Sequence, residues 1–214
     1  MSVKVKGISI RNEELSYDVE IPFSNLTVKG QERMFLDNKD IFICEAFASK
    51  YDTVRKLAYD NMSDCSSESL NKVISSLCNI DENMDFHDIC ENMDLIIEIL
   101  YMPNFVLEDE VREKLIDSNY LEVILSIAFL PTTPYETLCD ILINFALKEA
   151  FWNYHSLTMF YAVIHNPNFK ITVEIEEVIS KFYDILETYT KTRPEYVYSQ
   201  IKADFEHAIQ NVEK

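Results

Sequence analysis

Glycine is almost missing from this chain of 214 residues, since it occurs only at Gly7 and Gly30. A phosphate-binding P-loop, a dinucleotide-binding GxGxxG turn and a GxSxG nucleophile elbow all need glycine, because the backbone there turns sharply or approaches a ligand closely. Residues 31–214 contain no glycine at all. The sequence therefore excludes these three kinds of enzyme site.

Long apolar runs and paired-cysteine motifs are missing as well. The longest apolar blocks, such as IAFL at 127–130, are far shorter than the roughly 20 residues of a membrane-spanning helix. No apolar run of signal-peptide length follows Lys4 and Lys6, so we expect a cytoplasmic protein that does not enter a membrane. No CxxC occurs, and we expect reduced, mostly buried thiols at Cys44, Cys65, Cys78, Cys90 and Cys139.

Basic residues are scarce relative to acidic ones, at 19 Lys and Arg against 37 Asp and Glu, for a formal net charge of −18. The imbalance is strongest over residues 73–111, which hold ten acids and no Lys or Arg. Phosphate contacts need clustered Lys and Arg, so direct binding to nucleic acid through a broad basic face is not expected. The charge favours a protein partner with a basic surface.

The first residues of the chain have the pattern of β-structure. In LSYDVEI, residues 15–21, apolar and polar side chains alternate with the period of two that is typical of a half-buried strand. A bend at Gly7 and a turn at residues 11–14 would pair this strand with the preceding residues in a hairpin, and NLTVKG at 25–30 is read as a short third strand. We expect a β element over residues 1–36, packed on an α-helical domain over residues 37–214.

From about residue 38 the apolar spacing is helical to the end of the chain. Thr133 is the expected N-cap of one helix, with Pro134 at the first helical position and Glu136 three residues after the cap. The predicted fold is mainly α, a single-domain multi-helix bundle or irregular helical-repeat-like array with a small N-terminal β-hairpin. The expected helices span 39–61, 67–79, 86–102, 107–117, 119–130, 134–150, 154–165, 171–191 and 194–212.

Pro-Asn-Phe occurs twice, at 103–105 and at 167–169, which are 64 positions apart. Each copy reads as a helix end, a short extended spacer and the next helix, and 64 residues could span a pair of helical hairpins. Residues 119–157 resemble the helical hairpins of armadillo or HEAT-type solenoids, over about a fifth of the chain. The resemblance implies stacked helices that form a scaffold for a peptide or a helix.

Residues 79–94, NIDENMDFHDICENMD, contain the densest group of metal-ligand residue types. A calcium loop that started at Asp81 would need Gly where Phe86 stands and a bidentate Glu where Asn92 stands. His87 and Cys90 have the spacing of two zinc ligands on one helix face, but no second pair lies near them in the sequence. We expect no bound metal and no cofactor.

Two stretches are the candidate partner-binding surfaces. The acids of residues 79–94 recur at spacings that place several on one helix face, where like charges repel, and a surface that keeps this repulsion is a candidate for recognition. Residues 151–169 are rich in aromatic side chains, which form either core or an interface, while His155 and His165 lack the neighbours of a general base. The residues expected to bind the partner are Asp81, Glu82, Asp85, Asp88, Glu91, Asp94, Trp152, Tyr154 and Tyr161.

The most concrete function that we expect is non-enzymatic: an acidic inhibitor or adaptor that engages a basic surface. That surface could be a groove that normally holds nucleic acid, as with phage-encoded antagonists of host nucleases. The alternative is an armadillo- or HEAT-like scaffold that binds a peptide or helix. A small hydrolase is a third alternative, because carboxylate chemistry leaves little trace in a single sequence.

Overall fold

Helices form most of the described chain, and two short strands precede them, as the sequence predicted. The computed structural model describes residues 2–6, 18–78, 84–146 and 154–181, together with the single residues 203 and 207. The predicted helices beyond residue 181 lie outside this part of the chain.

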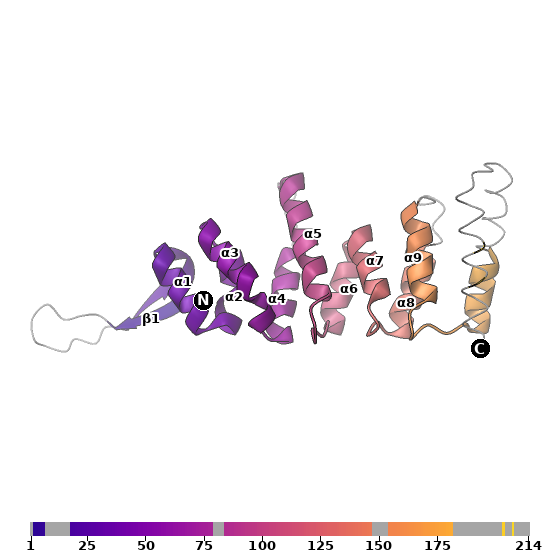
Figure 1. Ribbon diagram of the computed structural model, residues 1–214, viewed down its shortest axis with the longest axis horizontal. Helices are drawn as coiled ribbons and strands as arrows, with labels where there is room; N and C mark the ends of the chain where they lie inside the picture. The colour runs from indigo at the N-terminus through magenta and orange to yellow at the C-terminus, as the bar shows by residue number, and fades with distance from the viewer. Residues whose placement is uncertain are drawn as a thin grey trace, which may run out of the picture. The chain divides into compact units, whose positions relative to one another are not determined.

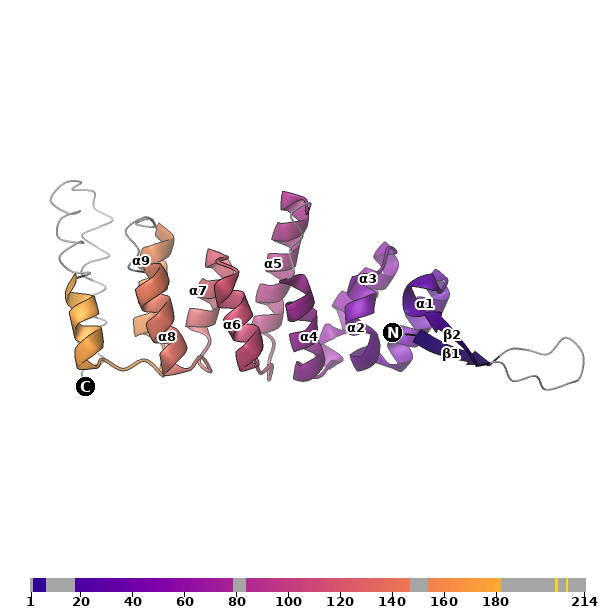
Figure 2. The same ribbon diagram turned by 180° about the vertical axis from the view of Figure 1, so that it is seen from behind.

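The N-terminal hairpin is formed by β1 (Ser2–Lys6) and β2 (Asp18–Pro22). The strands are antiparallel, and Val3 is opposite Ile21 in their register. β2 runs directly into the short 3-10 helix η1 (Phe23–Asn25), which precedes the first α-helix (Figure 2). The hairpin is confirmed, whereas the predicted bend at Gly7 and turn at 11–14 lie outside the described residues.

The predicted third strand is wrong, because residues 28–30 begin helix α1 (Val28–Asp37). Thr27 has extended backbone angles and its hydroxyl accepts a hydrogen bond from Gly30 N at 3.3 Å, which caps the helix. Gln31 and Phe35, four residues apart, form the buried side of α1. The cap at Thr27 therefore starts a helix where a strand was predicted, and the chain becomes helical ten residues earlier than its apolar spacing indicated.

The single helix predicted over 39–61 is two helices, α2 (Lys39–Phe47) and α3 (Asp52–Asn61). Buried Ser49 holds the break between them. Its hydroxyl donates to Gln31 Oε1 at 2.6 Å and accepts from Tyr51 N at 3.2 Å, while its carbonyl accepts from Arg55 Nη1 at 2.6 Å. A tertiary contact with Gln31 thus supports the turn, which explains why spacing within the segment did not reveal it.

The described helices group into two compact units. The first comprises residues 1–89 with 102–111, and in it α2 packs against α1, α3 and α4 (Figure 1). The second comprises residues 90–101 with 112–214, and in it α7 and α8 pack against α9. The remaining elements are η2 (Met62–Asp64), α4 (Ser67–Leu77), α5 (Phe86–Leu100), α6 (Asp109–Asp117), α7 (Leu121–Phe129), α8 (Tyr135–Ile141), the π-helical turn η3 (Leu142–Ala146), α9 (Tyr154–Ile164) and a helix over 173–181.

Helix α8 begins one residue later than predicted. Pro134 is its N-cap, with extended backbone angles, and Tyr135 is the first helical residue. Thr133 does not cap α8, because its buried hydroxyl donates instead to the carbonyl of Ile127 at 2.5 Å. Thr133 therefore fixes the turn between α7 and α8.

The repeat predicted from the two Pro-Asn-Phe sequences is present in the backbone. Helices α5 and α9 end 64 positions apart, at residues 100 and 164, and the helices that follow start at 109 and 173. Both turns contain the same backbone hydrogen bond, from Phe105 N to Met102 O at 3.2 Å and from Phe169 N to Asn166 O at 2.9 Å. Buried positions also recur at this interval, as in Val111 and Ile175. The chain therefore uses one helix–turn–helix design twice.

All five cysteines are free thiols and all are half-buried. The prediction of reduced cysteines is consistent with this, but the prediction that most are buried is wrong. None of the five belongs to the fully apolar core, which in the first unit includes a stack of Phe23 on Phe42 with ring centroids 5.1 Å apart.

Candidate functional site

Helix α5 separates its apolar and acidic side chains onto opposite sides. Met93, Ile96, Ile99 and Leu100 are its buried residues. At 100° per residue, the acids at 91, 94 and 98 fall on the other side of the helix, and the acid at 88 lies at the edge of that side, in the first turn. All four are exposed, and we call them the acidic face: Asp88, Glu91, Asp94 and Glu98.

Asp85 is placed differently from the acidic face, although the sequence grouped it with these residues. Its carboxylate Oδ1 accepts a hydrogen bond from His87 N at 3.0 Å, and its carbonyl accepts from Ile89 N at 3.1 Å. This is the geometry of a helix N-cap, so Asp85 stabilises the start of α5. Asp88 lies in the first turn, where the helix dipole also favours a negative charge.

No Lys or Arg of the same segment can neutralise the acidic face, because residues 73–111 contain none. The first helices contain ion pairs between acids and bases. Lys39 Nζ lies 2.5 Å from Asp64 Oδ2, and Lys72 Nζ lies 2.6 Å from Glu68 Oε1. The negative charge of the chain is thus concentrated on α5 and the residues beside it, while the first helices carry acids and bases together.

The metal interpretations of residues 79–94 gain nothing from the structure. Among the residues that the structure describes, no group of three or more His, Cys, Asp or Glu could hold a metal ion. His87 is exposed and Cys90 is half-buried. Asp81 and Glu82 lie outside the described residues, so their predicted part in partner binding stays a prediction.

The aromatic segment divides between core and surface. Phe160 and Phe169 are buried in the second unit, whereas Tyr161 is 42% exposed. Tyr161 stacks on the ring of His165, with centroids 3.9 Å apart, and His165 Nδ1 lies 3.0 Å from Tyr161 O. Trp152 and the side chain of Tyr154 lie outside the part of the chain described here, so the aromatic patch is seen only at Tyr161.

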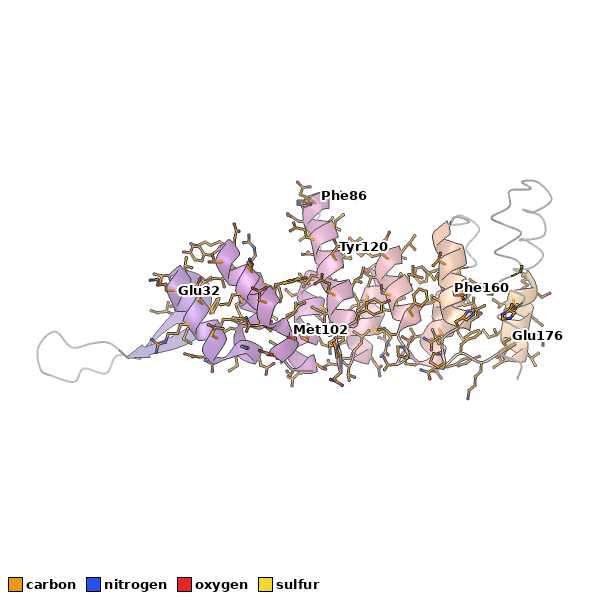
Figure 3. All side chains as sticks on the ribbon, in the orientation of Figure 1. Glu32, Phe86, Met102, Tyr120, Phe160 and Glu176 are labelled. Carbon is orange, nitrogen blue, oxygen red and sulfur yellow. The ribbon has the colours of Figure 1, made fainter. Side chains whose placement is uncertain are left out.

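Phe86 was missed as a surface residue by the sequence analysis. It is the first residue of α5 and is 78% exposed, with its side chain at the free end of the helix (Figure 3). An aromatic ring that stays in water beside a group of acids is typical of an interface anchor. The sequence signal was available, because Phe86 interrupts a run of polar residues just before the buried positions of α5 begin.

A pocket of about 490 Å³ lies in the first unit, between the turn that leads into α4 and the turn that follows α5. We call it the loop pocket. One wall is Ser63, residues 65–67 and Leu70, and the other is residues 102–105. Its volume is in the range of small-molecule and peptide side-chain sites, roughly 300–1,000 Å³. The sequence analysis did not predict it, since neither turn carries a recognisable ligand motif.

Hydrogen bonds fix the two walls of the loop pocket relative to each other. Fully buried Asn71 donates from Nδ2 to Val106 O at 2.8 Å and accepts at Oδ1 from Glu108 N at 3.1 Å. Ser67 Oγ accepts from Val106 N at 3.1 Å. These hydrogen bonds hold the segment after the second wall against α4, which carries part of the first wall.

The thiol at the loop pocket is not prepared for nucleophilic chemistry. Burial raises the pKa of Cys65 to about 11, so this side chain is a neutral thiol at physiological pH. Burial likewise raises the pKa of Cys44 and of Cys139. These three cysteines lack the lowered pKa of a catalytic thiol.

Comparison with family models, with curated proteins and with solved structures gave no match. Within the described ranges, no helix is both long enough and apolar enough to cross a bilayer.

Proposed function

We propose that this chain is a non-enzymatic binding protein whose acidic face on α5 engages a basic surface of a protein partner. The observation that supports the proposal is the arrangement of α5. Three exposed acids oppose its buried side and exposed Asp88 lies beside them in the first turn, in a segment that contains no Lys or Arg. Like charges at these spacings cost a helix tenths of a kcal/mol per pair, so a use outside the fold accounts for their presence.

Complementary charge acts mainly on the rate of encounter between the two proteins. It steers association over a Debye length of about 8 Å at physiological ionic strength and falls with added salt. Exposed Phe86 at the start of α5 provides an apolar contact beside these charges. A groove that normally holds nucleic acid is the most concrete kind of basic surface for such a partner, and the chain would then act as an inhibitor.

The test uses two variants of the whole chain, each with four acids neutralised. The first changes the acidic face: Asp88→Asn, Glu91→Gln, Asp94→Asn and Glu98→Gln. The control changes four exposed acids of the second unit: Glu136, Glu174, Glu176 and Glu177, each to Gln. Proteins captured from the native source by the unaltered chain and by the control, but lost from the first variant, would support the proposal. Equal capture by both variants would contradict it.

A second candidate function is a helical-repeat scaffold that binds an extended peptide. The observation that favours it is the recurrence of one helix–turn–helix design at an interval of 64 residues. Stacked helical pairs of this kind form long surfaces for peptides and helices. Deleting the acidic charges would leave peptide binding through the turns unaffected, which separates the two candidates.

A further inference from the structure

The turns that form the loop pocket have counterparts in the second unit, where an aromatic ring joins them. Tyr135, the first residue of α8, lies against the ring of Phe169 in the turn after α9, with ring centroids 6.3 Å apart. The Tyr135 hydroxyl donates to Thr172 Oγ1 at 3.3 Å, in the segment that follows the same turn. Phe169 is only 5% exposed. A tyrosine side chain from α8 thus covers the ring of the turn after α9.

Helices α4 and α8 correspond residue by residue at an interval of 68 positions. Their N-caps, Ser66 and Pro134, have nearly the same backbone angles, with φ/ψ of −69°/153° and −65°/154°. Buried residues recur at the same interval, in the pairs Leu70 and Leu138, Val73 and Ile141, and Ile74 and Leu142. The first helical residues are therefore counterparts, and Ser67 stands where the second unit has Tyr135.

The turns after α5 and after α9 correspond at the interval of 64, which makes Phe105 the counterpart of Phe169. Phe105 is half-buried, so its ring is more exposed than that of Phe169. Over the residues that the structure describes, no aromatic ring lies on Phe105. Ser67 and Phe105 both line the loop pocket, and Figure 3 labels Met102 in the same turn as Phe105. The pocket therefore lies where Ser67, in place of a tyrosine, leaves the ring of Phe105 without an aromatic partner.

The lining of the loop pocket suits a ring that has one polar end. Four apolar residues of the wall can contact the ring: Leu70, Met102, Pro103 and Phe105. The hydroxyls of Ser63 and Ser67 and the carboxamide of Asn104 lie in the same wall and can bond to a phenolic hydroxyl. None of the described residues that line the pocket is charged, so a neutral side chain fits it better than an ion. Tyrosine combines a large apolar ring with a polar tip and is a frequent interface anchor.

We propose that the loop pocket binds the side chain of a tyrosine on a peptide segment of a partner protein, in the place that Tyr135 takes within the second unit. The bound ring packs on Phe105, and its hydroxyl bonds to the polar part of the wall. The volume of about 490 Å³ is larger than one ring, and the neighbouring peptide groups of the partner occupy the rest. The site rests on the scaffold function, the second candidate above, and does not depend on the acidic face of α5.

The first experiment adds capped amino acids to the unaltered full chain and follows the backbone amide signals in ¹H–¹⁵N spectra. N-acetyl-tyrosine N′-methylamide is expected to shift the amides of residues 65–67 and 104–105, with saturation. N-acetyl-leucine N′-methylamide is apolar but has no ring, and it should bind about fivefold more weakly or worse. Equal affinity for the two probes, or no saturable shift with the tyrosine probe, would overturn the proposal. p-Cresol is the tyrosine side chain alone, and if it binds as tightly as the capped residue, a peptide is not the occupant.

The second experiment supplies the ring from within the chain. Ser67→Tyr introduces the residue that begins α8, so its ring should occupy the pocket and weaken binding of the tyrosine probe by about tenfold or more. Ser67→Ala is the matched control, because it loses the same hydroxyl and its hydrogen bond from Val106 N without adding a ring, and it should retain binding. Unchanged binding by a folded Ser67→Tyr variant, or an equal loss in both variants, would contradict the proposal.

A third variant keeps the proposal testable if circular dichroism shows that Ser67→Tyr does not fold. Phe105→Leu keeps an apolar side chain in the wall but removes the ring on which the bound tyrosine packs. It should weaken binding of the tyrosine probe and leave that of the leucine probe nearly unaltered, whereas full retention of the tyrosine probe would overturn the proposal. None of these readings involves the acidic face, so a failure at the loop pocket and a failure of the acidic-face function are distinguishable.

Discussion

Replacing Asn166 by Ala should destabilise the second unit more than replacement of any exposed residue there. Asn166 is 5% exposed and takes part in three hydrogen bonds, two from its Nδ2 to Ala128 O and Leu130 O and one at its Oδ1 from Asn168 N at 3.0 Å. Each such bond contributes roughly 1 kcal/mol. The carbonyl of Leu130 keeps its bond from Thr133 N at 3.1 Å, so the loss is that of the three bonds of Asn166. The expected loss in the free energy of unfolding is about 3 kcal/mol.

Urea denaturation followed by circular dichroism measures this loss. With a slope of about 2 kcal/mol per molar urea, the midpoint of the affected transition should fall by roughly 1.5 M. Hydrogen exchange should also speed up in the turn before α8, because the side chains of Asn166 and Asn168 hold this turn against the one after α9. A shift in the midpoint below about 0.3 M would refute the reasoning, since the three hydrogen bonds of Asn166 would then contribute almost nothing.

Two further variants separate hydrogen bonding from packing. Asn166→Asp keeps the size of the side chain but removes both N–H donors, so it should be at least as destabilising as Asn166→Ala. Asn71→Ala is the counterpart in the first unit, where buried Asn71 also takes part in three hydrogen bonds, and the expected loss is again about 3 kcal/mol. If Asn166→Asp is tolerated while Asn166→Ala is not, packing and not hydrogen bonding holds the turns together.

Three other substitutions test single contacts. Asp85→Ala should lower the free energy of unfolding by about 1 kcal/mol through loss of the α5 N-cap, whereas Asp85→Asn should have little effect, and thermal unfolding distinguishes the two. Asp40 Oδ1 accepts from Ser66 N at 2.6 Å, and this hydrogen bond holds the pKa of the Asp40 carboxyl below its ordinary value of 3.8. The stabilisation by Asp40 is therefore complete above that value and is lost as the pH falls through the lower folded pKa. The difference in the free energy of unfolding between the unaltered chain and Asp40→Asn should be constant from pH 5 to 7 and should shrink in acid. Cys65, with its pKa of about 11, should react with iodoacetamide at pH 7.5 far more slowly in the folded chain than after unfolding in urea, and equal rates would show that the thiol is not held at the pocket wall.

The helical class and the N-terminal hairpin could be predicted from the sequence because both depend on local periodicity. The helix boundaries could not always be predicted, because several are decided by contacts between distant residues. The break at 48–51 depends on Ser49 meeting Gln31, and the turn before α8 depends on Thr133 reaching back to Ile127. A segment that is apolar on both sides of such a turn reads as one continuous helix.

The acidic face could be predicted from spacing, since positions three and four apart share one side of a helix. The distinct role of Asp85 could not, because a cap depends on where α5 starts. The loop pocket was beyond prediction for another reason. It lies between two turns, before α4 and after α5, that are far apart in the sequence and meet only in the folded chain.

The measurement that tests the central proposal most directly is the association rate of the captured partner with the acidic-face variant, compared with the unaltered chain at two salt concentrations. Neutralising the acidic face should leave the melting temperature unchanged or slightly higher, because repulsion is removed. The association rate should fall by about tenfold or more, and its dependence on salt should flatten, while the control with four acids neutralised in the second unit keeps nearly the original rate and slope. An acidic-face variant that binds with the original rate and the original salt slope would contradict the proposal that α5 recognises a basic partner.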